Sequence, residues 1–111
     1  MSAATPGRPA RIYHFADAAQ WRAQKDGGHY APAGWQREGF IHCATPAQVP
    51  GVVARHLRGR SNLLRLTLDA AMLGDSLRYD WSAASGDWYP HVHAPIDVRA
   101  VCAVDDFEPD S

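Results

Sequence analysis

The sequence predicts a small α+β domain, with helices mainly in the first half of the chain and strands crowded into the second. Its 111 residues are 46% hydrophobic, which is enough for one modest core. Apolar residues recur at helical spacing over residues 49–57 and alternate over residues 62–68. The separation of these two patterns along the chain favours a segregated α+β domain over alternating βαβ units.

Composition and charge limit the partners and the cellular location expected for this domain. We expect a flexible leader at 1–10, a single domain at 11–105 and an acidic tail at 106–111. Eleven basic and twelve acidic residues give a net charge of -1, which disfavours nucleic acid or an anionic membrane as a partner. The apolar runs are short and the start lacks a signal-peptide pattern, so we expect a cytoplasmic protein. Cys43 and Cys102 lie in apolar, strand-like runs and are expected to remain free thiols.

The first predicted elements are a strand and a helix. Residues 11–15 alternate between polar and apolar or run apolar in a β-prone way. Asp17 then offers a side-chain acceptor for the free amides of a helix that runs to about Lys25. Gly27-Gly28 ends this helix, because glycine readily takes the left-handed conformation. Trp21 is expected to anchor the helix to the sheet.

A loop, a strand and a second helix follow. Residues 29–38 contain proline and glycine and predict a loop with at most a short turn of helix. Residues 39–43 predict a strand. Thr45 to Gln48 resembles a capping box at a helix start. The spacing of the following residues predicts a regular helix with one buried face, ended by Gly59; these residues are Val49, Val52, Val53, His56 and Leu57.

The second half is mostly extended. Residues 62–68 alternate, with three leucines on one side, and predict a strand with one well-buried face. A turn or short helical segment is expected at 69–76 and a brief strand at 77–80. A polar loop at 82–87 follows, and a nearly uninterrupted closing strand is expected at 96–104.

The histidines are the strongest functional signal. His14 and His42 each lie in the middle of a predicted strand among apolar neighbours. A histidine in that position needs either a buried hydrogen-bond partner or a ligand, so each could be a satisfied core residue or part of a site. His91 and His93 lie between two prolines on an extended segment. We predict that His14, His42 and His91 line one polar cleft, which is the functional site.

Other kinds of chemistry have weaker support. His91 and His93 could bind a metal if a third ligand converged on them, since residues two apart on an extended segment share a face. The sequence offers no HExxH motif, no paired CxxC and no obvious carboxylate at ligand spacing, so we expect no tight metal site.

Cys43 adjoins His42, but neighbours on a strand face opposite sides and the histidine does not activate this thiol. Arg78 could clamp a phosphate or carboxylate, or be an exposed charge.

A set of motifs spans the chain from Arg11 to about Val104. It comprises Ile12-Tyr13-His14, Trp21, Gly28, Tyr30, the run Glu38-Gly39-Phe40-Ile41-His42-Cys43, Gln48-Val49, Leu77-Arg78-Tyr79, Tyr89-Pro90-His91 and Pro95. Together these motifs resemble the bacterial domain-of-unknown-function 952 family. The resemblance implies a fold similar to the ADP-ribosyltransferases, with a bent, split, mostly antiparallel sheet, two main helices and NAD held in a cleft.

The resemblance also implies roles for single residues. His14 matches the first-strand histidine that meets the ribose on the nicotinamide side, and Tyr30 matches an aromatic residue near the nicotinamide. His42 resembles the second histidine of the lineage that contains the RNA 2′-phosphotransferases. No counterpart of the late-strand glutamate of classical transferases is present, and His91 stands in that region instead. We therefore expect His14, His42 and His91 to be catalytic; the expected NAD-binding residues are Tyr13, His14, Tyr30 and Arg78.

Three functional hypotheses follow. The first is an enzyme that binds a small nucleotide ligand and acts on NAD or on an ADP-ribosylated or 2′-phosphorylated substrate. The second is a non-catalytic module that retains the cleft and binds a nucleotide-like ligand or a partner protein. The third is a small metalloenzyme that uses His91 and His93. Turnover of NAD and metal analysis of protein without a histidine tag distinguish the three.

Overall fold

Three small antiparallel sheets form the framework of the computed structural model, which describes residues 8–109. The sheets have the strand orders β1-β4-β8, β2-β7 and β3-β6-β5. The strands are β1 Arg11–Asp17, β2 His29–Tyr30, β3 Ile41–His42, β4 Leu63–Asp69, β5 Leu77–Ser82, β6 Asp87–Val92, β7 Ile96–Asp97 and β8 Val101–Phe107. The α-helices are α1 Ala18–Gln24, α2 Trp35–Glu38, α3 Val49–Val52 and α4 Ala70–Leu73. The predicted α+β class is confirmed.

The β1-β4-β8 sheet carries most of the core. Leu64, Leu66 and Leu68 are at most 4% exposed, so the predicted well-buried face is confirmed, although Leu63 on the other side is buried as well. On β1, Ile12 and Ala16 are also buried, and His14 lies between them on the same buried face. The strand pattern of β1 therefore turns an imidazole into the core, where it needs polar partners.

The helix α1 forms as its capping signals predict. The Asp17 carboxylate accepts a hydrogen bond from the amide of Gln20 at 3.0 Å, which satisfies one of the free amides of the first turn. Trp21 is 7% exposed and packs into the core. After α1, a 3-10 turn at Lys25–Gly27 leads to Gly28, whose φ of 94° is left-handed.

The segment between β3 and β4 differs from the regular helix that was predicted. It begins with a 3-10 turn at Pro46–Gln48, where the Gln48 side chain accepts from the Thr45 amide at 3.0 Å, as expected for a capping box. It continues as α3 and then as a π-helix at Val53–Leu57. Only Leu57 is buried, so the prediction of one buried face was wrong. The segment lies along a cleft, which leaves its apolar residues half covered.

The closing strand is broken, contrary to its prediction as nearly continuous. A 3-10 turn at Val98–Ala100 separates β7 from β8. The two strands consequently belong to different sheets. The cause is local, because the Asp97 carboxylate accepts from the amide of Arg99 at 2.8 Å and stabilises a turn there.

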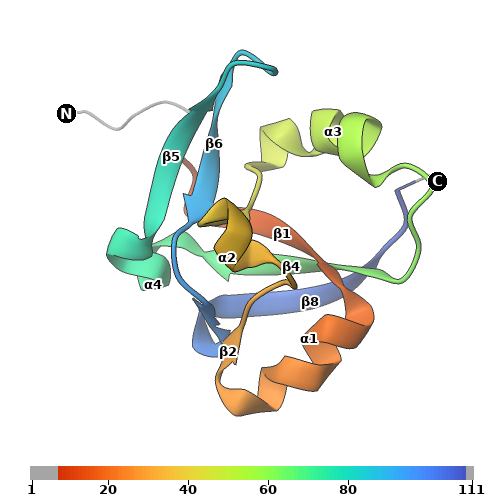
Figure 1. Cartoon of the computed structure of the whole chain (residues 1–111), viewed down its shortest axis with the longest axis vertical. Coiled ribbons are helices and arrows are strands. Elements are labelled where there is room, and N and C mark those ends of the chain that lie inside the picture. The colour runs from red at the N-terminus through yellow and green to blue at the C-terminus, as the bar shows by residue number, and fades with distance from the viewer. Residues whose placement is uncertain (1–7, 110–111) are drawn as a thin grey trace.

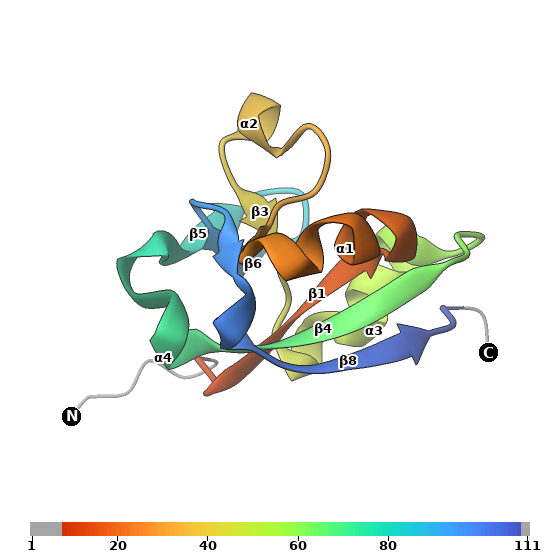
Figure 2. The ribbon, with the colours of Figure 1, turned by 90° about the horizontal axis from the view of Figure 1, so that it is seen from below.

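The segment from residue 29 to residue 43 contains more structure at its start and less at its end than predicted. His29 and Tyr30 form the short strand β2, while β3 is limited to Ile41 and His42. The helix α2 stands at the tip of the intervening loop, away from the rest of the fold (Figure 2). It supplies the one turn of helix that was expected there.

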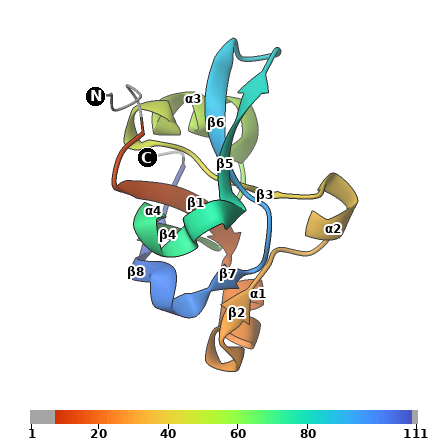
Figure 3. The ribbon, with the colours of Figure 1, turned by 90° about the vertical axis from the view of Figure 1, so that its left-hand side faces the viewer.

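The third sheet is built on the β5–β6 hairpin, which projects from the body of the molecule beside α3 (Figures 1 and 3). The strand β3 pairs with β6 so that His42 lies directly opposite His91. A backbone bridge between Tyr13 and Ala44 connects this sheet to β1. The bridge places β1, β3 and β6 side by side, and these three strands carry the three histidines that were predicted to converge.

The ends of the predicted domain need one adjustment. β8 continues to Phe107, two residues beyond the predicted limit at Asp105, because Phe107 pairs with Leu63. Residues 1–7 of the predicted leader and residues 110–111 of the predicted tail lie outside the described residues. Cys43 is buried and Cys102 exposed, and both are free thiols. No helix within 8–109 is long and apolar enough to span a membrane.

Candidate functional site

One cleft of about 790 Å³ is lined by all three histidines that sequence reasoning placed in a site. His14 comes from β1, His42 from β3 and His91 from β6. The volume of the cleft lies in the range typical of small-molecule and cofactor sites. The opposite wall is supplied by the end of α3 and the π-helix, and π-helical turns occur frequently at functional sites.

His14 forms the buried floor of the cleft, and its partners define which ring nitrogen carries the proton. Nδ1 lies 2.7 Å from the main-chain carbonyl oxygen of His42, which can only accept, so Nδ1 carries the hydrogen. Nε2 is then an acceptor, and the Tyr30 hydroxyl donates to it at 3.2 Å. His14 is thus held in one orientation by groups from two other strands.

Burial also determines the charge of His14. Its side chain is enclosed, and this desolvation lowers the pKa of the imidazole from 6.5 to about 4 against the opposing hydrogen bond to the His42 carbonyl. At neutral pH the ring is therefore uncharged. A neutral imidazole with a fixed tautomer is suited to hydrogen bonding with a ligand hydroxyl rather than to pairing with an anion.

His42 has the most exposed imidazole of the three, and its Nε2 meets the Glu38 carboxylate at the end of α2. The Phe40 ring lies edge-on to it, with ring centroids 4.9 Å apart. The centroid of the His42 ring is 5.4 Å from that of the His91 ring. His42 and His91 therefore contact each other, while His14 reaches them through the His42 main chain.

His91 is held by a carboxylate and an aromatic ring. Its Nδ1 lies 2.7 Å from Asp80 Oδ2, and the Phe40 ring stacks on it at a centroid distance of 4.0 Å. Burial lowers the pKa of His91, and the bond to Asp80 opposes this shift without reversing it. These two contacts fix the ring plane, as expected for a side chain that orients a ligand.

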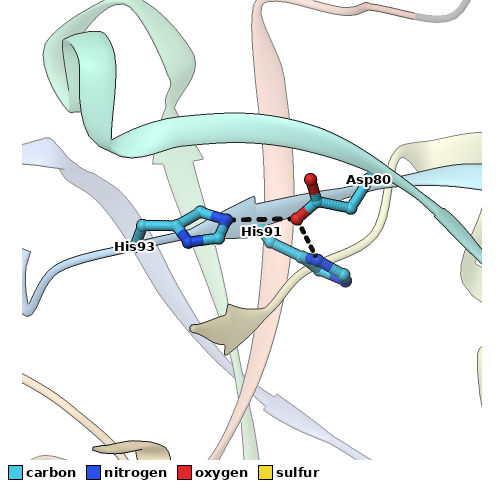
Figure 4. Close-up of side chains that lie close together, drawn as sticks. All are labelled: Asp80, His91 and His93. Atoms are coloured by element: carbon cyan, nitrogen blue, oxygen red, sulfur yellow. Dashed lines mark hydrogen bonds and ion pairs between the residues drawn. The ribbon is translucent and has the colours of Figure 1, made fainter. Parts of the chain in front are cut away.

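Asp80 also holds His93, whose Nε2 lies 3.1 Å from the same oxygen (Figure 4). Burial tends to raise the pKa of Asp80, but hydrogen bonds from the two histidines outweigh it and the pKa is lowered. Asp80, His91 and His93 place one potential metal-ligand atom each within 4.8 Å of one another. This is the convergent third ligand that the sequence pattern did not supply.

Of the residues expected to bind NAD, Tyr13 and Arg78 lie outside the cleft, whereas Tyr30 borders it without any exposed surface. Tyr13 points to the opposite face of β1 from His14 and packs under the Arg65 guanidinium rather than lining the cleft. Arg78 lies directly opposite His91 but on the edge strand β5, where it is exposed and outside the cleft. Tyr30 has no exposed surface, so its ring is a core residue that orients His14 and is not available for stacking on a ligand.

The comparisons place the chain in a family. The family model described as "Protein of unknown function (DUF952)" matches residues 15–104, which include His42 and His91 and begin one residue after His14. The chain belongs to the DUF952 family. Comparison with curated proteins gives no match.

Solved structures of another protein are similar to this DUF952 chain. The X-ray structure of protein CC0527 from Caulobacter crescentus has a TM-score of 0.80 and 31% identity, covering 88% of this chain and 86% of that one. A double mutant of CC0527 gives a TM-score of 0.80 at 30% identity, with the same shares covered. The solution NMR structure of CC0527 gives 0.76 at 31% identity, covering 90% of this chain and 86% of that one.

Several residues of the candidate site were missed by sequence reasoning. Glu38, Phe40 and Arg55 contact the cleft, and Asp80 holds two histidines behind it. Asp80 lies opposite Tyr89 and so shares a face with His91, but this follows only from the register of the hairpin, which the sequence analysis did not assign. Arg55 had no such signal, since its position depends on the irregular helix; its guanidinium donates to the Tyr89 hydroxyl at 2.6 Å.

Proposed function

We propose that this DUF952 protein is an enzyme of ADP-ribosyltransferase-like type that binds NAD or a related nucleotide in the histidine-lined cleft. The observation that carries the proposal is the meeting of His14, His42 and His91, from three separate strands, in one cleft of small-molecule size. Each of these imidazoles is held by a specific partner, as residues that position a substrate must be.

The side chains around the histidines match the parts of a nucleotide. Trp35, Phe40 and Tyr89 offer partly exposed aromatic surfaces on which a base or a nicotinamide ring can stack. Arg55 and Arg60 line the same cleft and suit the pyrophosphate, because guanidinium groups pair with phosphate oxygens in two places at once. The three histidines suit ribose hydroxyls, which both donate and accept.

The ADP-ribosyltransferase-like fold is part of this proposal. It rests on the motif resemblance and is supported by the split antiparallel arrangement, in which β1-β4-β8 and β3-β6-β5 are separate sheets connected by a bridge beside His14. The resemblance implies that the split sheet of that fold holds NAD in a cleft. The cleft here is lined by β1 of one sheet and by β3 and β6 of the other.

The proposed reaction is dissociative. When the bond between nicotinamide and ribose breaks, positive charge develops on the ribose, so the site must orient the sugar and exclude water more than it must supply a strong nucleophile. His14 contacts a ribose hydroxyl at the floor of the cleft, where Tyr30 and the His42 carbonyl oxygen hold its ring. His42 and His91 orient the acceptor or transfer protons at the exposed side of the cleft. The ring that stacks on the nicotinamide is Phe40 or Trp35 rather than the buried Tyr30.

Titration calorimetry with NAD and with ADP-ribose tests the binding step. We expect saturable binding to the unmodified chain and at least about tenfold weaker binding in His42→Gln and in Arg55→Gln, since each removes one charge-assisted or orienting contact. His29→Gln is the matched control, because His29 is exposed on β2 and does not line the cleft. Absence of binding to the unmodified chain, or equal affinity in all four proteins, contradicts the proposal.

A second measurement separates an enzyme from a binding module. The protein is incubated with NAD and the release of free nicotinamide is followed over time. Release that depends on His42 supports the enzyme. Saturable nucleotide binding with no release of nicotinamide, from NAD alone or with added RNA and protein acceptors, instead makes the chain a non-catalytic nucleotide-binding module.

A further inference from the structure

We infer that Asp80, His91 and His93 form a binding site for a divalent transition-metal ion of the zinc class. Asp80 comes from β5, His91 from β6 and His93 from just beyond the end of β6, and the three side chains point toward one another (Figure 4). The inference does not depend on the proposed nucleotide function, because Asp80 and His93 do not line the cleft and only His91 is shared with it.

The spacing of the ligand atoms fits one metal ion. His91 Nδ1 and His93 Nε2 lie 2.7 and 3.1 Å from Asp80 Oδ2, and all three atoms lie within 4.8 Å of one another. Ligand atoms bound tetrahedrally to zinc at its usual bond lengths are about 3.4 Å apart. The separations within the cluster, from 2.7 Å to at most 4.8 Å, span this value, so one ion can contact all three atoms after small adjustments of the side chains.

The donor set selects the class of metal. Two neutral imidazoles and one carboxylate are the ligands of open zinc sites and of non-haem iron sites, whereas calcium and magnesium prefer oxygen atoms alone. The side chain of Asp80 is 41% exposed, that of His93 26% and that of His91 11%. One side of the site thus faces solvent, so a bound ion has an entry path and keeps at least one position for water.

The surroundings hold the ligands in place. Asp80 and His91 belong to paired strands, and the amide of His93 donates to the Ser76 carbonyl oxygen at 2.7 Å just beyond the end of β6. Phe40 stacks on the His91 ring at 4.0 Å and fixes its plane. A site whose ligands are already oriented loses little conformational entropy when it binds an ion.

The cluster can also be explained without a metal. In that case Asp80 accepts one N–H hydrogen bond from each histidine and serves only to orient His91. The two explanations differ in whether residue 80 must carry a negative charge. An asparagine there keeps an oxygen that accepts hydrogen bonds and so preserves the orienting role, but it removes the anionic ligand that a metal needs.

Calorimetric titration of the tag-free protein with Zn²⁺ tests the inference. We expect one equivalent to bind, and at least about tenfold weaker binding in Asp80→Asn and in His93→Gln, because each loses one of three ligands. His29→Gln, which alters a histidine outside the cluster, is expected to bind like the unmodified chain. No zinc uptake by the unmodified protein, or equal affinity in Asp80→Asn, overturns the inference.

A measurement on the unmodified chain guards against variants that fail to fold. Co²⁺ is titrated into the protein and the histidine ring resonances are followed by NMR. Selective broadening of His91 and His93 at low Co²⁺, before His29 is affected, supports the site. Broadening that begins at His29, or uniformly at all histidines, overturns it.

Discussion

Each histidine of the cleft is defined by the groups that hold it rather than by its own chemistry. His14 is fixed by a main-chain carbonyl and a buried tyrosine, His42 by Glu38, and His91 by Asp80 and Phe40. The sequence could predict that a histidine inside an apolar strand needs such a partner, because an unpaired buried polar group is costly. It could not predict which partner, since each one lies on a different element.

Burial of His14 predicts a pH dependence of stability. The pKa of His14 is about 4 in the folded protein, against 6.5 for an unperturbed histidine in the unfolded chain, so the unfolded chain binds a proton first as the pH falls. Acidification through this window therefore favours unfolding. This residue alone is expected to reduce the free energy of unfolding by about 2 kcal/mol between pH 7 and pH 5, from linkage between the two pKa values.

Urea denaturation of the unmodified chain and of His14→Gln at both pH values checks this expectation. The variant is expected to be less stable at pH 7 because it loses buried hydrogen bonds, but its disadvantage should shrink by about 2 kcal/mol at pH 5. All other titrating groups are common to both proteins, so their contributions cancel in the difference between the two free energies of unfolding. A stability difference that stays constant, or grows as the pH falls, is incompatible with a buried neutral His14.

Elements with a strong local signal agree with the sequence, and elements that depend on tertiary contacts do not. β4 and the start of α1 were predicted correctly, because alternation and a capping aspartate act within a few residues. The segment after Pro46 was predicted as a regular helix from its spacing alone. It is instead a succession of 3-10, α and π turns, because it covers a cleft rather than packing against a complete core.

The capping role of Asp17 gives a prediction at the scale of one element. Asp17→Ala removes the acceptor for the Gln20 amide and is expected to reduce the free energy of unfolding by about 1 kcal/mol. Asp17→Asn keeps an acceptor oxygen at the same place and is expected to stay within a few tenths of a kcal/mol of the unmodified chain. Thermal and urea denaturation measure both. An asparagine variant as unstable as the alanine variant would show that the charge, not the cap, is what matters.

At the scale of the whole molecule, the division into three sheets brings the site together. The α+β class was predicted correctly from the sequence. His14, His42 and His91 were predicted to line one cleft, and the fold brings them together there. The sequence did not predict that β7 and β8 belong to different sheets, because one 3-10 turn of three residues decides this. Nor did it predict Asp80 beside His93, because their proximity depends on the register of a hairpin.

The central claim is that three imidazoles share one nucleotide-binding cleft, and histidine-ring NMR of the unmodified protein during titration with ADP-ribose tests it most directly. The ring resonances of His14, His42 and His91 are predicted to shift together and to saturate at one equivalent, while those of His29, which lies outside the cleft, stay in place. If the three rings do not respond, or if only His29 shifts, the claim is contradicted.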